Sequence, residues 1–215
     1  MKPEAYAVLN DLFEHYPKLE GQKRGITKAF EIMVSCYKAG GKLLICGNGG
    51  SAADSEHIVG ELMKGFMLPR TPSPEEQAAL RKALPKEQAD YFIGHLQRGI
   101  PAISLVSHSG LFSAYVNDVA ADMAFAQQVF VYAKPEDALF AITTSGASAN
   151  VLNALRIAKA IGIKSILLMG NRNSENTNLA DIPICVDESE TYMIQELHLP
   201  IYHALCAAAE AELFA

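Results

Sequence analysis

The sequence lacks long apolar runs and an excess of positive charge. No apolar run approaches the roughly 18 residues needed to cross a membrane, and the first residues, Met1 to Tyr6, contain no apolar signal-peptide core. The formal net charge of -6 at pH 7 argues against nucleic acid as a partner. We therefore expect a cytoplasmic protein that binds neither a membrane nor nucleic acid.

Closely spaced cysteine pairs are also missing. The chain has four cysteines in largely apolar settings, and no two form a C-x-x-C motif: Cys36, Cys46, Cys185 and Cys206. A structural zinc site or a dithiol redox centre normally needs such pairs. The sequence therefore predicts reduced cysteines that pack in the core.

The chain of 215 residues, half of them hydrophobic, suits one domain that spans residues 1–215. Short apolar segments predict strands at about 42–46, 102–106, 138–142, 164–169 and 182–186. Two helices are expected in the first forty residues, and further helices at about 52–66, 111–119, 122–132, 149–160 and 190–213, the last with Pro200 as a possible kink. Buried strands that alternate with helices predict an α/β fold with a parallel sheet covered on both faces.

Residues 70–98 differ from this alternation and are expected to form a helical insertion. Three prolines interrupt a charged stretch, and Ser73-Pro74-Glu75-Glu76 is a helix-start signature. The basic residues of this segment suit a lid over a site or a contact between subunits: Arg70, Arg81, Lys82 and Arg98. A solvated helical decoration explains them equally well.

A glycine-rich turn, Gly47-Asn48-Gly49-Gly50-Ser51, lies between the first predicted strand and the helix that follows it. Glycines let the backbone approach a ligand closely, and the free N–H groups and dipole of a helix N-terminus favour an anion. A tight strand–helix corner is the simpler alternative.

A second turn, Thr143-Thr144-Ser145-Gly146-Ala147-Ser148, follows the third predicted strand and begins the next helix. An ordinary N-cap explains one of its hydroxyls but not the others. Both turns fall beyond carboxyl ends of strands, where ligands of such folds bind. Together they predict a phosphate site, although the chain lacks the G-K-[ST] and G-x-G-x-x-G signatures of nucleotide and dinucleotide sites.

Several ionisable residues lie within reach of this site. His57 and Glu61 are one helical turn apart and so project from one face, which suits acid–base chemistry, metal binding or a plain ion pair. The last helix adds His203, for which spacing alone does not decide between Gln195 and Glu196 as the accompanying residue. His198 is expected to be a packed or surface histidine.

These residues resemble the sugar isomerase (SIS) domain family, and within it the phosphoheptose isomerases. The resemblance rests on Gly47 to Asp54 with His57 and Glu61, on Asn117-Asp118, on the Thr143 to Asn150 turn, and on Ile194 to His198 with His203. It covers nearly the whole chain except 70–98. It implies a three-layer αβα sandwich with a central parallel five-stranded sheet, similar to flavodoxin, preceded by N-terminal helices.

The resemblance also implies roles for individual residues. It assigns phosphate contacts to Ser51, Thr143, Ser145 and Ser148, with Asn48, Gly49, Gly50, Asn117, Asp118, Thr144 and Gln195 lining the substrate site. Glu61 would be the base and His203 its acid–base partner in moving a proton between adjacent sugar carbons. Some members of the family hold zinc, here through His57, Glu61, Gln195 and His203. They form homotetramers with sites at subunit boundaries, so that Glu61 and His203 need not come from one chain.

The activity implied is the conversion of sedoheptulose 7-phosphate to D-glycero-D-manno-heptose 7-phosphate through an enediol. A carboxylate and a histidine suit that proton transfer, and zinc would polarise the carbonyl. Departures from the family pattern at His108, Tyr192 and Gly65 leave the sugar open, so an isomerase of another sugar phosphate is one alternative. The other is a non-catalytic SIS protein that binds a sugar phosphate or a protein partner, as replication-initiator-binding relatives do.

Overall fold

The computed structural model describes residues 1–215, which form an α/β sandwich around one parallel sheet. The sheet has five strands in the order β2-β1-β3-β4-β5. Their bounds are β1 (Leu43–Cys46), β2 (Ala102–Ser104), β3 (Ala138–Thr143), β4 (Lys164–Gly170) and β5 (Ile182–Val186). All six residues of β3 are buried, as expected for a strand with helices on both sides. The predicted fold class is confirmed.

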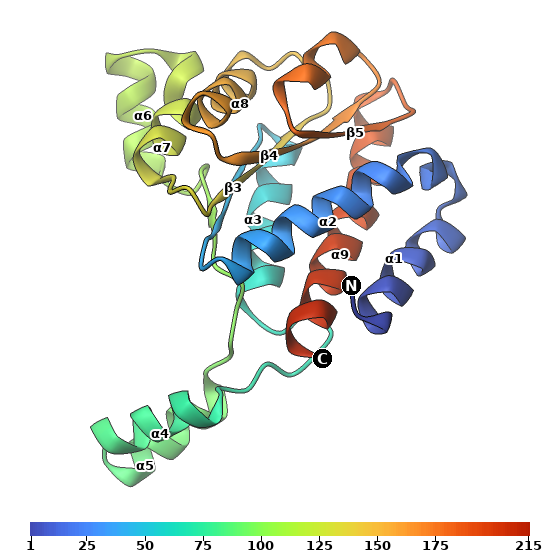
Figure 1. Ribbon diagram of the computed structural model, residues 1–215. Helices are drawn as coiled ribbons and strands as arrows, with labels where there is room; N and C mark the ends of the chain where they lie inside the picture. Colours follow the sequence, from blue (N-terminus) through green and yellow to red (C-terminus); the bar gives the residue numbers. More distant parts are fainter.

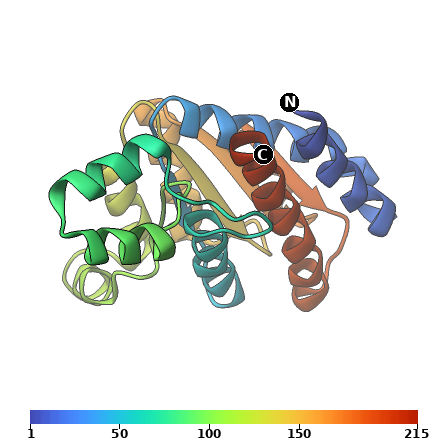
Figure 2. The ribbon, with the colours of Figure 1, turned by 90° about the horizontal axis from the view of Figure 1, so that it is seen from below.

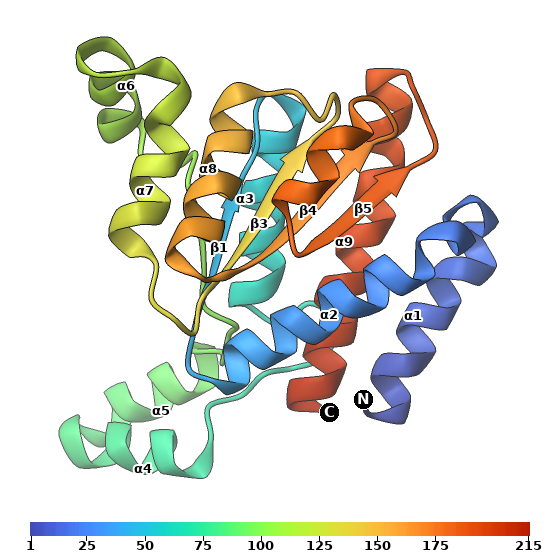
Figure 3. The ribbon, with the colours of Figure 1, turned by 45° about the horizontal axis from the view of Figure 1, so that its top comes forward.

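Alternate residues of the strands pack into two separate cores. Phe140 and Ile142 of β3 face a core formed with α1 (Pro3–His15), α2 (Lys23–Lys38), α3 (Gly50–Met63) and α9 (Thr191–Phe214). Leu139 and Ala141 face the other core, formed with α7 (Ala124–Tyr132) and α8 (Ala149–Ile161). This alternation follows from the two-residue period of a strand, and Figure 3 shows the helices on either side of the sheet.

Most predicted elements lie within a few residues of their observed bounds. The glycine turn is shorter than predicted because α3 already begins at Gly50, and β2 ends at Ser104 instead of residue 106. The last helix, α9, continues through Pro200 to Phe214. Three short 3-10 helices complete the chain: Pro17–Gln22, Ala121–Met123 and Ser174–Leu179. No helix is both long and apolar enough to cross a membrane.

The insertion is a helical hairpin made of α4 (Pro74–Ala83) and α5 (Lys86–His95). Ser73 begins α4 with a complete capping box to Glu76, as the sequence predicts. Figures 1 and 2 show the hairpin projecting from the body, and Ala89 is the only residue buried within its two helices. Because it connects the end of α3 to the start of β2, its root lies at the amino edge of the sheet. It therefore does not cover the glycine turns of its own chain.

Candidate active site

The first glycine turn connects β1 to α3 at the carboxyl edge of the sheet. Gly49 has a φ of +56° and is the N-cap residue of α3, a conformation that favours glycine. The amide end of the Gln195 side chain, from α9, lies where a side chain at Gly50 would begin. Ser51 is buried in the first turn of α3. The backbone N–H groups of this helix start are oriented to receive an anion.

The second turn connects β3 to α8 and concentrates hydroxyl groups. Thr143 Oγ1 lies 3.0 Å from Ser148 Oγ and 3.5 Å from Ser145 Oγ, and Ala147 N donates to Ser145 Oγ at 3.1 Å. Ser148 is the N-cap residue of α8 but makes no capping hydrogen bond with its side chain. An N-cap therefore does not explain its hydroxyl, which instead joins the cluster of hydroxyls through Thr143, a group that can donate to ligand oxygens.

An amide pair joins the two turns. Asn48 Nδ2 donates to Asn150 Oδ1 and Asn150 Nδ2 donates to Asn48 Oδ1, both at 2.9 Å. Asn48 precedes α3, and Asn150 lies in the first turn of α8. The sequence analysis did not select Asn150 as a site residue, because a polar residue near a helix start has no distinctive signal. The pair holds the two helix N-termini side by side.

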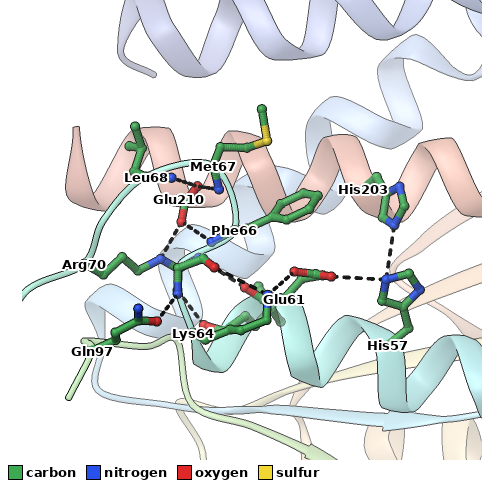
Figure 4. Close-up of polar contacts among 12 residues, drawn as sticks. His57, Glu61, Lys64, Phe66, Met67, Leu68, Arg70, Gln97, His203 and Glu210 are labelled. Atoms are coloured by element: carbon green, nitrogen blue, oxygen red, sulfur yellow. Dashed lines mark hydrogen bonds and ion pairs between the residues drawn. The ribbon is translucent and has the colours of Figure 1, made fainter. Parts of the chain in front are cut away.

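The residues expected to transfer protons meet farther along α3. His57 Nε2 lies 3.1 Å from Glu61 Oε1 and 3.5 Å from His203 Nε2, so that His57 stands between the other two (Figure 4). The His57 and His203 rings meet edge to face with their centroids 4.9 Å apart. Phe66 packs on the other side of His203, with ring centroids 5.6 Å apart. The structure thus places Glu61 and His203 together within one chain.

Tyr202 and Asp54, which the sequence analysis did not select, extend the hydrogen-bonded chain from the other ring nitrogen of His57. Tyr202 donates its hydroxyl proton to Asp54 Oδ1 at 3.1 Å, and His57 Nδ1 lies 3.1 Å from the same hydroxyl. The Tyr202 hydroxyl thus links the His57 ring to the Asp54 carboxyl group. The signal that could have found Asp54 is its position three residues before His57, on one face of α3.

The surroundings of the pair set its protonation. Burial acts to raise the pKa of Glu61, but hydrogen bonds and charge from Lys64 and His57 outweigh it and hold the pKa below the ordinary 4.5. Burial and the neighbouring His57 lower the pKa of His203 below 6.5. At neutral pH the site therefore offers an ionised carboxylate and a neutral imidazole, the states needed for a base and its partner.

Other predicted residues lie apart from this group. Asn117 and Asp118 bond to each other at 2.7 Å, exposed at the end of α6 (Ser109–Asp118), which Figures 1 and 3 place far from α9. His108 lies 3.4 Å from the Tyr132 hydroxyl near the end of β2. His198 is fully buried, so it is a packed histidine.

Gln195 and Glu196 have different surroundings. Gln195 lies against Gly50, whereas Glu196 lines a groove between α1 and α9 together with His203. This groove has a volume of about 840 Å³, and 12 of its 19 lining residues are hydrophobic. An apolar surface of this kind adjoining His203 suits contact with another molecule more than with water.

The four residues expected to bind zinc do not form one ligand group. Imidazole and carboxylate donors suit zinc, but no group of three or more His, Cys, Asp or Glu side chains is placed to hold a metal ion. Lys64 Nζ donates to Glu61 Oε2 at 2.8 Å. Gln195 lies beside Gly50, seven residues and thus about 10 Å along α3 from His57. The arrangement in one chain does not fit the ion, and zinc binding stays a prediction.

Comparison with known proteins agrees with this architecture. Two SIS domain models match residues 7–89 and 105–209, which defines the chain as a SIS domain protein. A phosphoheptose isomerase from Crocosphaera subtropica is 38% identical over 89% of this chain and 84% of its own length. One from Citrifermentans bemidjiense is 34% identical over 100% of this chain and 98% of its own. The chain therefore belongs to the phosphoheptose isomerase family.

Solved structures of the same family share the fold. A phosphoheptose isomerase from Francisella tularensis superposes with a TM-score of 0.74 at 28% identity, covering 98% of this chain and 100% of its own. One from Neisseria gonorrhoeae gives a TM-score of 0.71 at 26% identity, covering 96% and 95%. The resemblance noted in the sequence is confirmed.

Proposed function

We propose that this protein is an aldose–ketose isomerase that converts sedoheptulose 7-phosphate to D-glycero-D-manno-heptose 7-phosphate. The observation that supports this most directly is the contact of Glu61 and His203 with His57 in a protein whose relatives are named phosphoheptose isomerases. A protein that only binds a sugar phosphate needs the two turns but has no use for this group. The non-catalytic alternative is therefore disfavoured.

The chemistry follows from the charge states at the site. The Glu61 carboxylate removes a proton from C1 of the ketose, and the C1–C2 enediol forms as the C2 oxygen takes up a proton. Returning the first proton to C2 while the C1 oxygen loses its own completes the aldose. His203 exchanges the oxygen-bound protons, and His57, 3.5 Å away, is placed to supply or accept them. The first and second turns hold the phosphate through Ser51, Thr143, Ser145 and Ser148.

We also propose that the protein is a homotetramer whose active sites combine residues of two chains. Ser51 and Glu61 are ten residues apart on α3, about 15 Å along its axis. A sugar phosphate bound by one chain would have to span that separation between its phosphate and its carbonyl end. A second chain that brings its own Glu61 and His203 to the turns removes this requirement. The apolar groove beside His203 is a surface on which such a chain would pack.

A panel of five- to seven-carbon ketose phosphates in heavy water tests the proposed reaction. We expect the seven-carbon substrate to yield aldose phosphate and to exchange its C1 proton, as followed by NMR. Exchange with a shorter sugar only would make the protein an isomerase of that sugar, as the exposed Tyr192 and the presence of His108 near the end of β2 allow. No exchange with any sugar phosphate, with or without added zinc, would refute the isomerase assignment.

Zinc, if bound, would supply a Lewis acid that polarises the sugar carbonyl, with His57, Glu61, Gln195 and His203 as ligands. Because one chain does not bring Gln195 to the other three, we expect zinc only where subunits meet. Elemental analysis of the purified oligomer, together with activity before and after dialysis against a chelator, checks this. Zinc-free protein of undiminished activity would remove zinc from the proposal.

A further inference from the structure

A fully buried ion pair lies next to Glu61 and His203, the two residues that we call the proton-transfer group. Arg70 follows α3 in the chain and Glu210 lies on α9, and both side chains are completely buried. Arg70 Nε donates to Glu210 Oε1 at 2.6 Å. The sequence did not predict this pair, since Arg70 was grouped with the basic residues of the insertion, for which a lid, a subunit contact and a solvated decoration were the alternatives.

Every nitrogen of the Arg70 guanidinium and both oxygens of the Glu210 carboxylate have a hydrogen-bond partner. Besides Arg70, the Glu210 carboxylate accepts three backbone N–H bonds, from Phe66 at 2.8 Å, Met67 at 2.6 Å and Leu68 at 3.0 Å. The other two Arg70 nitrogens each donate one bond, Nη1 to Leu62 O at 2.6 Å and Nη2 to Glu61 O at 3.2 Å. Removing two charges from water costs more than such a pair commonly returns, so an ion pair of this kind is weak grounds for stability alone. What the Arg70–Glu210 pair does define is the position of the backbone segments to which it is bonded.

The pair fixes the end of the helix that presents Glu61. Residues Glu61 and Leu62 belong to the last turn of α3, whose carbonyl groups have no partners within the helix. The Arg70 guanidinium bonds two of them and places a positive charge at the negative end of the helix dipole. Figure 4 shows Arg70 and Glu210 on the opposite side of Glu61 from His57.

The same pair fixes His203 through the segment 66–68. The three N–H groups bound to Glu210 hold this segment against α9, and its first residue, Phe66, packs on the His203 ring. Gly65 N also donates to Gln97 Oε1 at 2.8 Å, and Arg98 N donates to Arg70 O at 2.6 Å, so both ends of the insertion are tied to this point. One buried pair thus determines where both members of the proton-transfer group stand.

We propose that Arg70 and Glu210 are positioning residues of the isomerase, which hold Glu61 and His203 in register for proton transfer. The inference rests on the roles proposed above for those two residues. Because both side chains are fully buried, neither Arg70 nor Glu210 would touch the substrate. Their loss should therefore lower kcat and leave KM almost unchanged, because the phosphate is held at the other end of α3.

The chain offers a matched control in Asp137, at the start of β3. This buried carboxylate also accepts backbone N–H bonds, from Lys42 and Lys134 at 2.8 Å each, and pairs with the Lys42 ammonium at 2.5 Å. It lies at the amino edge of the sheet and has no contact with Glu61 or His203. Glu210→Gln and Asp137→Asn therefore remove similar buried charges, and only the first disturbs the proton-transfer group.

The test compares the two full-length variants with the wild type. We expect both to have a lower Tm, but Glu210→Gln alone to lose kcat by on the order of 10²-fold, the effect of misplacing a reacting group by about 1 Å. The KM of Glu210→Gln should stay within about threefold of the wild-type KM. The kcat of Asp137→Asn should also stay within about threefold of the wild-type kcat. Arg70→Lys keeps the charge beside Glu210 but loses the fork that reaches Glu61 and Leu62, so it should also lower kcat, and it decides the matter if Glu210→Gln does not fold.

A second readout separates this inference from the proposed function. The imidazole NMR signals of His57 and His203 report their contacts with Glu61 and Phe66 whether or not the protein turns over a sugar. We expect these signals to shift in Glu210→Gln and Arg70→Lys and to stay in place in Asp137→Asn. Unshifted histidine signals in the folded variants, or a kcat no lower than in Asp137→Asn, would overturn the positioning role. An inactive wild type with shifted signals would refute only the isomerase assignment.

Discussion

Glu61 has two neighbours that donate to its carboxylate, the Lys64 ammonium and the His57 ring that leads to His203. Lys64 and His57 keep its carboxylate ionised, and that ionised form is the one that can remove a proton from carbon. A carboxylate with a higher pKa would be a stronger base. The lowered pKa of Glu61 instead keeps nearly all of it ionised at neutral pH.

This arrangement predicts the effect of removing the carboxylate. We expect Glu61→Gln, which keeps the size of the side chain, to lower kcat by on the order of 10²–10⁴-fold, the usual contribution of a general base. Steady-state kinetics with sedoheptulose 7-phosphate measure it. Glu31→Gln, an exposed change on α2, is the control and should be neutral. A Glu61→Gln enzyme with wild-type kcat would assign the base to another residue.

His198 is a second residue whose environment predicts a measurement. Burial lowers its pKa from 6.5 to about 4, against an opposing effect of the Met169 backbone, with which the ring makes no well-formed hydrogen bond. The unfolded chain binds a proton near pH 6.5 and the folded chain does not, so the neutral ring stabilises the fold above that pH. This stability is lost as the pH falls from about 6.5 toward 4, and amounts to about 3 kcal/mol over that window.

Urea unfolding at pH 7 and pH 4.5 checks this with His198→Leu, which cannot titrate. We expect the free energy of unfolding of the wild type to fall by about 2–3 kcal/mol more than that of the variant between the two pH values. The comparison of the two proteins removes the contribution of carboxylates common to both. Equal losses would mean that His198 is reached by water or finds a partner that stabilises its charged form.

At the scale of elements, the two glycine- and hydroxyl-rich turns form one unit because the amide pair between Asn48 and Asn150 joins the starts of α3 and α8. Parallel topology brings β1 and β3 next to each other, and their carboxyl ends therefore place the two helix N-termini side by side. Two aligned helix dipoles and several hydroxyls then face one small volume. The insertion has the opposite character, since it adds two helices and almost no buried surface.

We therefore expect that the protein folds without the α4–α5 hairpin. Replacing residues 74–95 with a short Gly-Ser linker, while keeping Arg70, Gln97 and Arg98, should change the free energy of unfolding by less than about 1 kcal/mol, as for other surface changes. Denaturant unfolding of the shortened chain measures this. A loss of several kcal/mol would show that α4 and α5 are part of the cooperative core. Activity of the same protein would show whether the hairpin contributes to the site of a neighbouring chain.

At the scale of the whole molecule, local pattern was enough for the elements and the class of fold, because buried strands and their turns have strong signals. It also selected His57, Glu61 and His203 as ionisable residues near the turns, whereas their roles in the reaction were implied by the family resemblance and stay predictions. It did not reveal Arg70 and Glu210. A lone arginine beside prolines and a lone glutamate in an alanine-rich helix acquire meaning only when α9 packs against the segment 66–68, 140 residues apart in the chain. Long-range packing of this kind leaves no local trace.

The separation of phosphate turns and proton-transfer group along α3 predicts the behaviour of mixed oligomers. A Thr143→Val, Ser148→Ala double variant should lose phosphate binding, and His203→Ala should lose proton transfer, so each is inactive alone. If every site combines the turns of one chain with the histidine of another, a mixed oligomer contains sites in which both parts are intact. Random pairing makes these about a quarter of the total.

Co-expression of the two variants with different affinity tags, followed by tandem purification, gives the mixed oligomers. We expect them to recover about a quarter of wild-type activity, because chains carrying an intact turn meet chains carrying an intact His203. Mixing the purified variants without exchange of subunits is the control and should give none. Inactive mixed oligomers would mean that each chain holds a complete site. The sugar would then have to span the length of α3 between Ser51 and Glu61, and the site in each chain would close by bending α3 or α9 toward the turns.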